Sequence, residues 1–164
     1  MADINNSKLL QINAGILKKN ACVVIVRTEW NAGIVDELEA GCVRQLKQSG
    51  LADIKVIIVP GAFEIAFAIK SYWEQSKKKD RPDAFIALGC VLRGDTPHFD
   101  YVAGAAAEGS TRVSLDTGVP VLFGVITADN IQQATDRAGK RTDNKGFEAA
   151  MAAIEVVNLY KEVT

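Results

Sequence analysis

The sequence contains little histidine and little cysteine: His98 is its only histidine, and its three cysteines lie far apart at positions 22, 42 and 90. Their odd number and the lack of a Cys-x-x-Cys pair argue against a disulfide framework and against a cysteine-based zinc site. A metal role for His98 is disfavoured as well, because no second histidine or cysteine cluster accompanies it. Widely spaced, reduced thiols are typical of a cytoplasmic protein.

Long apolar runs and an excess of one charge are also absent. The 19 Lys and Arg residues nearly balance the 20 Asp and Glu residues, and no long basic block occurs, so bulk attraction to nucleic acid or to a membrane is not indicated. No segment approaches the roughly 18 apolar residues of a membrane span, and no signal-peptide run begins the sequence. We therefore expect one cytoplasmic domain over residues 1–164, with an N-terminal arm at 1–18 that contains a short extended piece at 9–12.

Short apolar, β-branched runs alternate along the chain with segments of helical spacing. The runs predict buried parallel strands at residues 21–27, 54–60, 83–89 and 119–127. The segments between and after them predict helices at residues 31–50, 61–79, 97–116 and 130–161, the last interrupted near 138–146. This alternation predicts a central parallel sheet of four strands with helices on both faces, a three-layer α/β/α fold of the flavodoxin-like class.

The carboxyl ends of the predicted strands point to a site. Open sheets of this kind bind ligands in the crevice beyond those ends. His98 lies just past the third strand end, in the first turn of the helix predicted at 97–116. Neutral imidazole at such a place can accept or relay a proton near pH 7. An ordinary helix-start histidine is the alternative, and the residues alone leave both interpretations open.

The segment GCVLRGDT, at residues 89–96, has the outline of a phosphate-binding P-loop. Asp95 replaces the lysine that this motif requires, and a carboxylate there would repel phosphate. A dinucleotide-binding fold is also disfavoured, because no Gly-x-Gly-x-x-Gly follows the first strand. We expect instead that Asp95 or Thr96 caps the next helix, with Pro97 in its first turn, so that backbone N–H groups can bind an anion. A plain helix start explains the same residues.

Three further features each allow two interpretations. Glu64 begins the second helix, where it either caps that helix or binds a hydroxylated ligand. Trp30 directly follows the first strand and either packs in the core or stacks on a planar ligand. Arg137, Arg141 and Lys145 form a basic cluster that is either a solvated helix face or a phosphate site.

Four blocks of the sequence together resemble the lumazine synthase family, which catalyses the penultimate step of riboflavin biosynthesis. They are VPGAFEI (59–65), GCVLRGDTPHFDYV (89–102), VPVLFGVIT (119–127) and RAGKRTDNKGFEAA (137–150). The resemblance implies the condensation of 5-amino-6-(D-ribitylamino)uracil with 3,4-dihydroxy-2-butanone 4-phosphate. The product would be 6,7-dimethyl-8-ribityllumazine, formed with loss of phosphate and water and without a metal or organic cofactor.

The resemblance also implies a role for individual residues. Residues that would hold the ribitylaminouracil are Trp30, Ala62, Phe63, Glu64, Cys90, Val91 and Leu92. Trp30 would stack on the pyrimidine ring, at a position where the family more often has phenylalanine. Asp95 and Thr96 would bind the phosphate of the butanone, mainly through backbone N–H groups and the threonine hydroxyl. His98 would carry protons.

Subunit assembly is implied in the same way. Phe123 and Arg137 would come from a neighbouring subunit, with Arg137 on the phosphate, and Lys145 would assist the charged intermediates. The resemblance implies a homo-oligomer, either a pentamer or a shell of sixty subunits, and makes riboflavin synthase a candidate partner. The alternatives are a non-catalytic flavin-binding relative, disfavoured by the presence of His98 and Thr96, and a flavodoxin-like redox carrier, disfavoured by the four matching blocks.

Overall fold

The computed structural model describes residues 21–139 and 144–163. The arm expected at residues 1–18, with its extended piece at 9–12, lies outside the described residues, as does Arg141. Within the described ranges, the elements are β1 (Cys22–Thr28), α1 (Ala32–Gln48), β2 (Asp53–Val59), η3 (Ala62–Glu64), α2 (Ile65–Gln75), η4 (Lys78–Asp80), β3 (Ala84–Leu92), α3 (His98–Thr117), β4 (Val121–Ala128), α4 (Ile131–Arg137) and α5 (Lys145–Val163), where η marks a short 3-10 helix.

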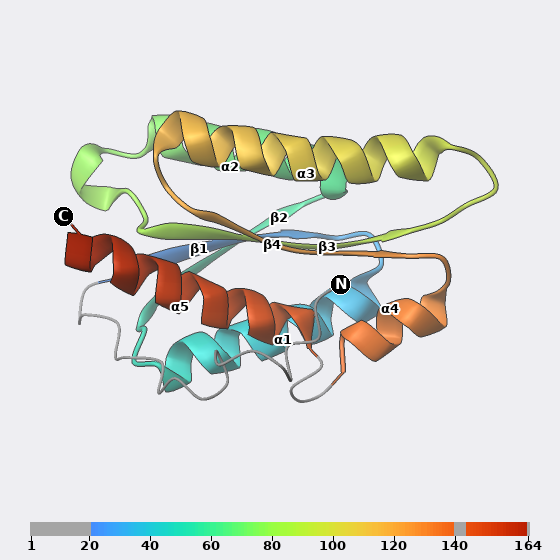
Figure 1. The fold of residues 1–164 in the computed structure, drawn as a ribbon, viewed down its shortest axis with the longest axis horizontal. Coiled ribbons are helices and arrows are strands. Elements are labelled where there is room, and N and C mark those ends of the chain that lie inside the picture. The colour runs from blue at the N-terminus through green and yellow to red at the C-terminus, as the bar shows by residue number, and fades with distance from the viewer. Residues whose placement is uncertain (1–20, 140–143, 164) are drawn as a thin grey trace.

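The strands of the described chain form one four-stranded sheet in the order β2-β1-β3-β4, and every neighbouring pair is parallel. Helices α2 and α3 cover one face of the sheet, and α1, α4 and α5 cover the other (Figure 1). The predicted three-layer, flavodoxin-like architecture is therefore confirmed. Because β2 and β3 lie on opposite sides of β1, the strand order reverses between β1 and β3, which is where such sheets bind ligands.

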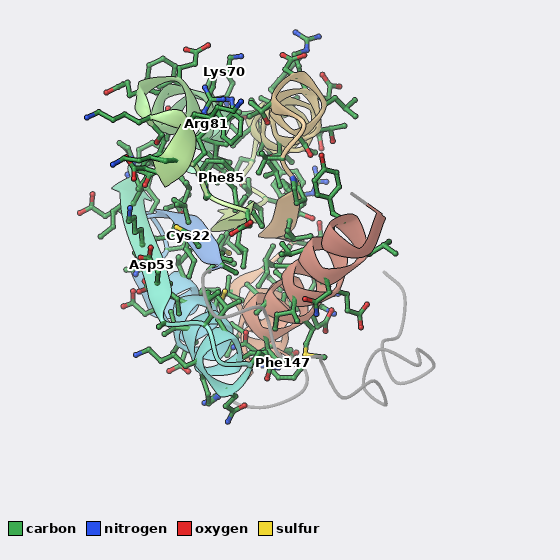
Figure 2. The ribbon with its side chains drawn as sticks, turned by 90° about the vertical axis from the view of Figure 1, so that its left-hand side faces the viewer. Cys22, Asp53, Lys70, Arg81, Phe85 and Phe147 are labelled. Atoms are coloured by element: carbon green, nitrogen blue, oxygen red, sulfur yellow. The ribbon has the colours of Figure 1, made fainter. Side chains whose placement is uncertain are left out.

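The hydrophobic core consists of two clusters that the sheet separates. The central strands β1 and β3 are buried along nearly their whole length, which explains why both read as continuous apolar runs. Phe85 of β3, labelled in Figure 2, lies in the layer under α2 and α3. Its ring is nearly perpendicular to that of Tyr72, with 6.0 Å between the ring centroids. Fully burying a side chain such as Phe85, Leu38 or Ile65 contributes about 1.5–3 kcal/mol.

The C-terminal ends of two predicted elements were wrong by three or more residues. Strand β3 continues to Leu92 instead of ending at residue 89, because residues 89–92 pair with residues 125–128 of β4. Helix α2 ends at Gln75 instead of 79, because Ser76 leaves the helix at ψ 133° and its hydroxyl donates a hydrogen bond to the Tyr72 carbonyl at 2.7 Å. Cys90, Val91 and Leu92 are thus strand residues.

Small residues allow close packing of the helices. A Cβ atom added to Gly109 of α3 would come within 2.7 Å of the Ala66 Cβ of α2. Helices α2 and α3 therefore pack closely at this point. Among the described residues, no helix is both long and apolar enough to cross a membrane.

Candidate active site

The turn that follows β1, residues 29–31, connects the ends of three strands; we call it the β1–α1 turn. The Trp30 amide donates a hydrogen bond to the Pro60 carbonyl after β2 at 3.1 Å. The Asn31 side chain donates one to the Cys90 carbonyl in β3 at 2.9 Å, and its backbone takes the left-handed conformation at φ 60°. The turn is thereby fixed at the point where the strand order reverses.

Trp30 is exposed at the rim of this crevice. Its exposed fraction is 65%, so the core interpretation is wrong and the ring is available to a planar ligand. The six-membered ring of the indole lies against Gly61, because a Cβ atom added there would come within 2.6 Å of Trp30 Cζ3. Phe63, in the neighbouring η3, is exposed as well. Sequence reasoning missed Gly61, although its place one residue past a predicted strand was a usable signal.

Glu64 caps the short helix η3. Its Oε2 accepts a hydrogen bond from the Gly61 amide at 2.9 Å, so the capping role is confirmed, and ligand binding by Glu64 stays a prediction. Ala62 is buried in the core cluster under α2. Ala62 can therefore contact a ligand through its backbone groups and not through its buried side chain.

The end of β3 also presents backbone to the crevice. Cys90 and Val91 are buried in the two opposite core clusters, and Leu92 is half-buried. Burial raises the pKa of the Cys90 thiol to about 11, so the thiol stays protonated near neutral pH and offers no thiolate nucleophile. Across residues 21–139 and 144–163, no group of three or more His, Cys, Asp or Glu side chains gathers as a metal site would require.

Helix α3 begins at His98, which is exposed together with Asp95 and Thr96. The expected capping by Asp95 or Thr96 was wrong. Pro97 occupies the N-cap position, and proline has no side-chain oxygen, so within the described chain this helix start has no side-chain cap. The first N–H groups of the helix therefore remain available to an anion beside His98.

Arg93 holds the loop before α3 and was missed by sequence reasoning. Its Nε donates to Asp129 after β4 at 2.9 Å, and its Nη2 lies 3.4 Å from Asp100 in α3. The guanidinium also lies over the Phe99 ring, 4.2 Å from its centroid. The loop that carries Asp95 and Thr96 is thus fixed between β4 and α3.

Phe123, Arg137 and Lys145, here called the edge group, belong to the edge strand β4 and to the two helices that follow it. Phe123 and Lys145 line a cavity of about 310 Å³ along the edge strand β4, and Lys145 forms an ion pair with Glu148 there. Arg137 ends α4 and donates to the Gln133 carbonyl at 3.0 Å. From Trp30, this edge is two strand spacings away, about 10 Å.

The structure therefore divides the predicted site residues into two sets. The strand-end group comprises Trp30, Ala62, Phe63, Glu64, Cys90, Val91, Leu92, Asp95, Thr96 and His98. Phe123 of the edge group lies apart from the strand-end group within one chain: it pairs with Ala87 in the middle of the sheet, about 16 Å along β4 before the strand ends at Ala128.

Asn144 positions the edge group and was also missed. It is 1% exposed and precedes α5, where its Oδ1 accepts the Phe147 amide at 2.9 Å. Its Nδ2 donates to the carbonyls of Glu37 in α1, at 2.8 Å, and of Ala138, at 3.3 Å. An N-capping asparagine directly before Lys145 was the available sequence signal.

Comparison with known proteins gives two concordant matches. The sequence model of a family described as 6,7-dimethyl-8-ribityllumazine synthase matches residues 20–161. A protein of Chlorobium phaeobacteroides named 6,7-dimethyl-8-ribityllumazine synthase is 41% identical over 157 residues, which cover 94% of this chain and 99% of that relative. Both matches include the whole strand-end group and the whole edge group.

Proposed function

This chain belongs to the 6,7-dimethyl-8-ribityllumazine synthase family, transferases of riboflavin biosynthesis, and we propose that it condenses 5-amino-6-(D-ribitylamino)uracil with 3,4-dihydroxy-2-butanone 4-phosphate. The observation that carries this proposal is the end of the sheet where the strand order reverses. There an exposed indole follows β1, and a helix start without a side-chain cap, which begins with the histidine of the chain, follows the neighbouring strand β3. The ribitylaminouracil has a planar ring that the indole can stack on, and the butanone has a phosphate that the helix start can bind.

The reaction itself needs orientation and proton transfer. An amine of the uracil attacks the ketone, and water leaves as an imine forms. Loss of the phosphate then breaks a carbon–oxygen bond and leaves an enol, which becomes a ketone. The second amine attacks that carbonyl and closes the ring with loss of a second water molecule. His98 accepts and returns protons during these steps, and the crevice aligns the two substrates.

The uracil binds on the side of β1 and β2. Trp30 stacks on its ring, and Phe63 borders the same space. Glu64 accepts hydrogen bonds with the carboxylate oxygen that does not cap η3. Backbone groups of residues 90–92 hold the ribityl chain, in keeping with the buried side chains of Cys90 and Val91.

The phosphate binds at the start of α3. The Thr96 hydroxyl and backbone N–H groups near Asp95 donate to its oxygens, and the positive end of the helix favours its charge. Arg137 pairs with the phosphate and stabilises the negative charge that develops as it leaves. Lys145 assists the charged intermediates.

The edge group acts from a neighbouring chain. Phe123 and Arg137 of one subunit complete the strand-end group of the next, and the distance of Phe123 from the strand ends within a single chain supports this arrangement. The assembly is a pentamer or a sixty-subunit shell in the cytoplasm, with riboflavin synthase as a candidate partner. Residues 1–164 act as one domain.

The direct test is product formation. The purified chain is mixed with both substrates, and the absorbance of 6,7-dimethyl-8-ribityllumazine is followed against a reaction without protein. We expect saturation in both substrates and a rate above the uncatalysed condensation. Riboflavin binding without any rate enhancement would instead favour a non-catalytic flavin-binding relative.

A further inference from the structure

Arg27 is a buried cation in a strand that is otherwise apolar on that side. The inward positions Val23 and Ile25 of β1 face α1, and Arg27 continues the same row with an exposed fraction of 8%. Central parallel strands normally carry apolar residues at such positions. A buried charge is costly unless it is paired and hydrogen-bonded, so its partners indicate what it holds together.

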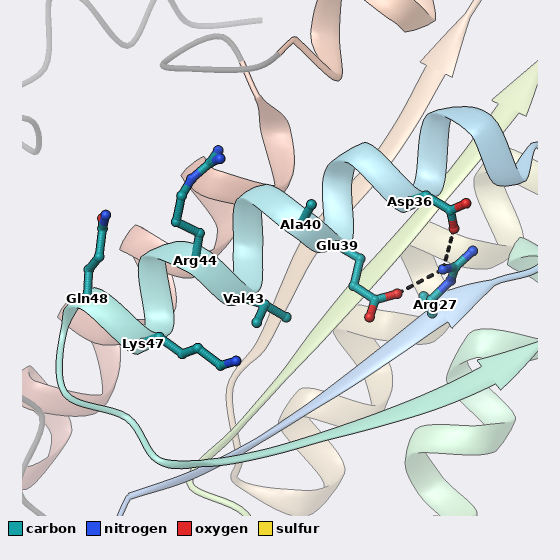
Figure 3. A pocket seen from close by; sticks show the side chains of 8 residues that line it. All are labelled: Arg27, Asp36, Glu39, Ala40, Val43, Arg44, Lys47 and Gln48. Carbon is teal, nitrogen blue, oxygen red and sulfur yellow. Dashed lines mark hydrogen bonds and ion pairs between the residues drawn. The ribbon is translucent and has the colours of Figure 1, made fainter.

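The guanidinium links the end of β1 to the first turns of α1. Its Nη1 donates to Asp36 Oδ1 at 2.6 Å and to Glu39 Oε2 at 2.8 Å (Figure 3). Its Nε and Nη2 both donate to the Thr28 carbonyl at 3.2 Å. Four of the five N–H donors are therefore used, in a planar arrangement that a lysine cannot reproduce. Burial alone would lower the pKa of Arg27, but hydrogen bonds to Glu39 and Asp36 outweigh it and raise that pKa, so the charge persists.

Thr28 is the last residue of β1, and Trp30 follows it by two residues. The Thr28 hydroxyl donates to the Trp30 carbonyl at 3.3 Å, so the residue that Arg27 holds is itself bonded to the tryptophan. On the other side, the β1–α1 turn is held by Pro60 and Cys90. Asn31 already joins the turn to α1, because its carbonyl accepts the Ile34 and Val35 amides, and Arg27 adds a side-chain attachment one turn further along that helix.

The surroundings of Arg27 make its removal a local change. A cavity of about 740 Å³ adjoins Arg27, Asp36 and Glu39 and continues along α1 to Lys47 (Figure 3). The Asp36 side chain is already 62% exposed, so water can solvate both carboxylates when the guanidinium is absent. A valine at position 27 would suit a buried parallel strand.

We propose that Arg27 is a positioning residue for Trp30: by fixing the Thr28 carbonyl to α1, it keeps the indole against Gly61 and raises the affinity for the ring stacked on Trp30. The identity of that ring rests on the proposed function, whereas the positioning of Trp30 does not. The inference therefore has one readout without substrate and one with it.

The substrate-free experiment measures the mobility of Trp30. Because the chain has two tryptophans, Trp73→Phe leaves Trp30 as the sole reporter. In that background, Arg27→Val should give a faster decay of Trp30 fluorescence anisotropy. Lys70→Met, which removes the exposed Lys70–Glu74 pair on α2, is the matched control and should leave the decay unchanged. An unchanged decay in folded Arg27→Val overturns the proposal, whether or not the protein makes lumazine.

The kinetic experiment distinguishes positioning from general stability. Arg27→Val should raise the KM for the ribitylaminouracil about two- to tenfold, the range of one aromatic stack, with kcat and the KM for the butanone phosphate nearly unchanged. In a Trp30→Ala background, Arg27→Val should add nothing, because both changes remove the same contact. An equal further rise in that background would show that Arg27 acts by another route.

A conservative variant covers the case in which Arg27→Val does not fold. Arg27→Lys keeps the charge near Asp36 and Glu39 but cannot also make two hydrogen bonds to the Thr28 carbonyl. We expect it to show the faster anisotropy decay and the raised KM in a folded protein. Wild-type values for both in Arg27→Lys would overturn the proposal.

Discussion

Asn144→Ala tests how the start of α5 is held in place. Asn144 makes three hydrogen bonds from a site that is 1% exposed: the cap to Phe147 and the bonds to the Glu37 and Ala138 carbonyls. Asn130 is the matched control, because it caps α4 through one bond to the Gln133 amide at an exposed site. Both asparagines cap a helix, and they differ in the two hydrogen bonds that Asn144 donates to the Glu37 and Ala138 carbonyls.

The magnitudes follow from these bonds. Loss of an N-cap costs about 1 kcal/mol, and a buried carbonyl left without its donor costs about 1–3 kcal/mol more. Asn144→Ala should therefore lower the free energy of unfolding by about 2–4 kcal/mol, and Asn130→Ala by about 1 kcal/mol or less. Because Lys145, which assists the charged intermediates, follows Asn144, kcat should fall in the first variant only.

The measurement is urea denaturation at one fixed protomer concentration, since assembly makes apparent stability depend on concentration. Aspartate variants at the same two positions give a second comparison of their unfolding free energies. Asn130→Asp should be tolerated, because a carboxylate caps well at a helix start. Asn144→Asp should be destabilising, because its oxygen would face the two carbonyls that Nδ2 now serves. Equal costs at positions 130 and 144 would refute the reasoning.

The remaining predictions concern the crevice and the assembly. Gly61→Ala places a methyl group about 2.6 Å from Trp30 Cζ3 and should raise the KM for the uracil about two- to tenfold; an unchanged KM would contradict the contact. Arg137→Ala should raise the KM for the butanone phosphate about ten- to a hundredfold, whereas unchanged kinetics would remove it from the phosphate site. His98→Ala should lower kcat, by about a hundredfold or less because water can also carry protons, and normal turnover would leave it a structural role. Light scattering should give the mass of about five or about sixty chains, and a clean monomer would contradict the assembly.

The layers of the fold were predictable because the signal is local. The apolar runs in β1 and β3 reflect burial on both faces of the sheet. The helical spacing in α1 reflects burial of one side of that helix. The true end of β3 was not predictable, because residues 90–92 become strand only by pairing with β4. The predicted cap of α3 was wrong for a different reason: Pro97 takes the N-cap position that Asp95 or Thr96 was expected to fill.

The site was predictable in position more than in detail. The carboxyl ends of the predicted parallel strands placed Trp30 and His98 at the same end of the sheet. Trp30, however, contacts Gly61, which lies far along the chain, and no sequence pattern indicated that contact. Arg27 and Asn144 were missed because each has partners far away in the sequence: Asp36 and Glu39 lie 9 and 12 positions from Arg27, and Glu37 lies 107 positions from Asn144. Such long-range pairs leave no periodic pattern.

The most direct test of the account is complementation between two defective variants. His98→Ala lacks part of the strand-end group, and Arg137→Ala lacks part of the edge group. If each active site combines His98 of one chain with Arg137 of a neighbour, chains unfolded together in equal amounts and refolded should recover about a quarter of the wild-type sites. The same variants refolded separately and then mixed serve as the control. Lumazine formation that rises toward that level is the predicted result, and co-refolded protein no more active than the control would contradict a shared site.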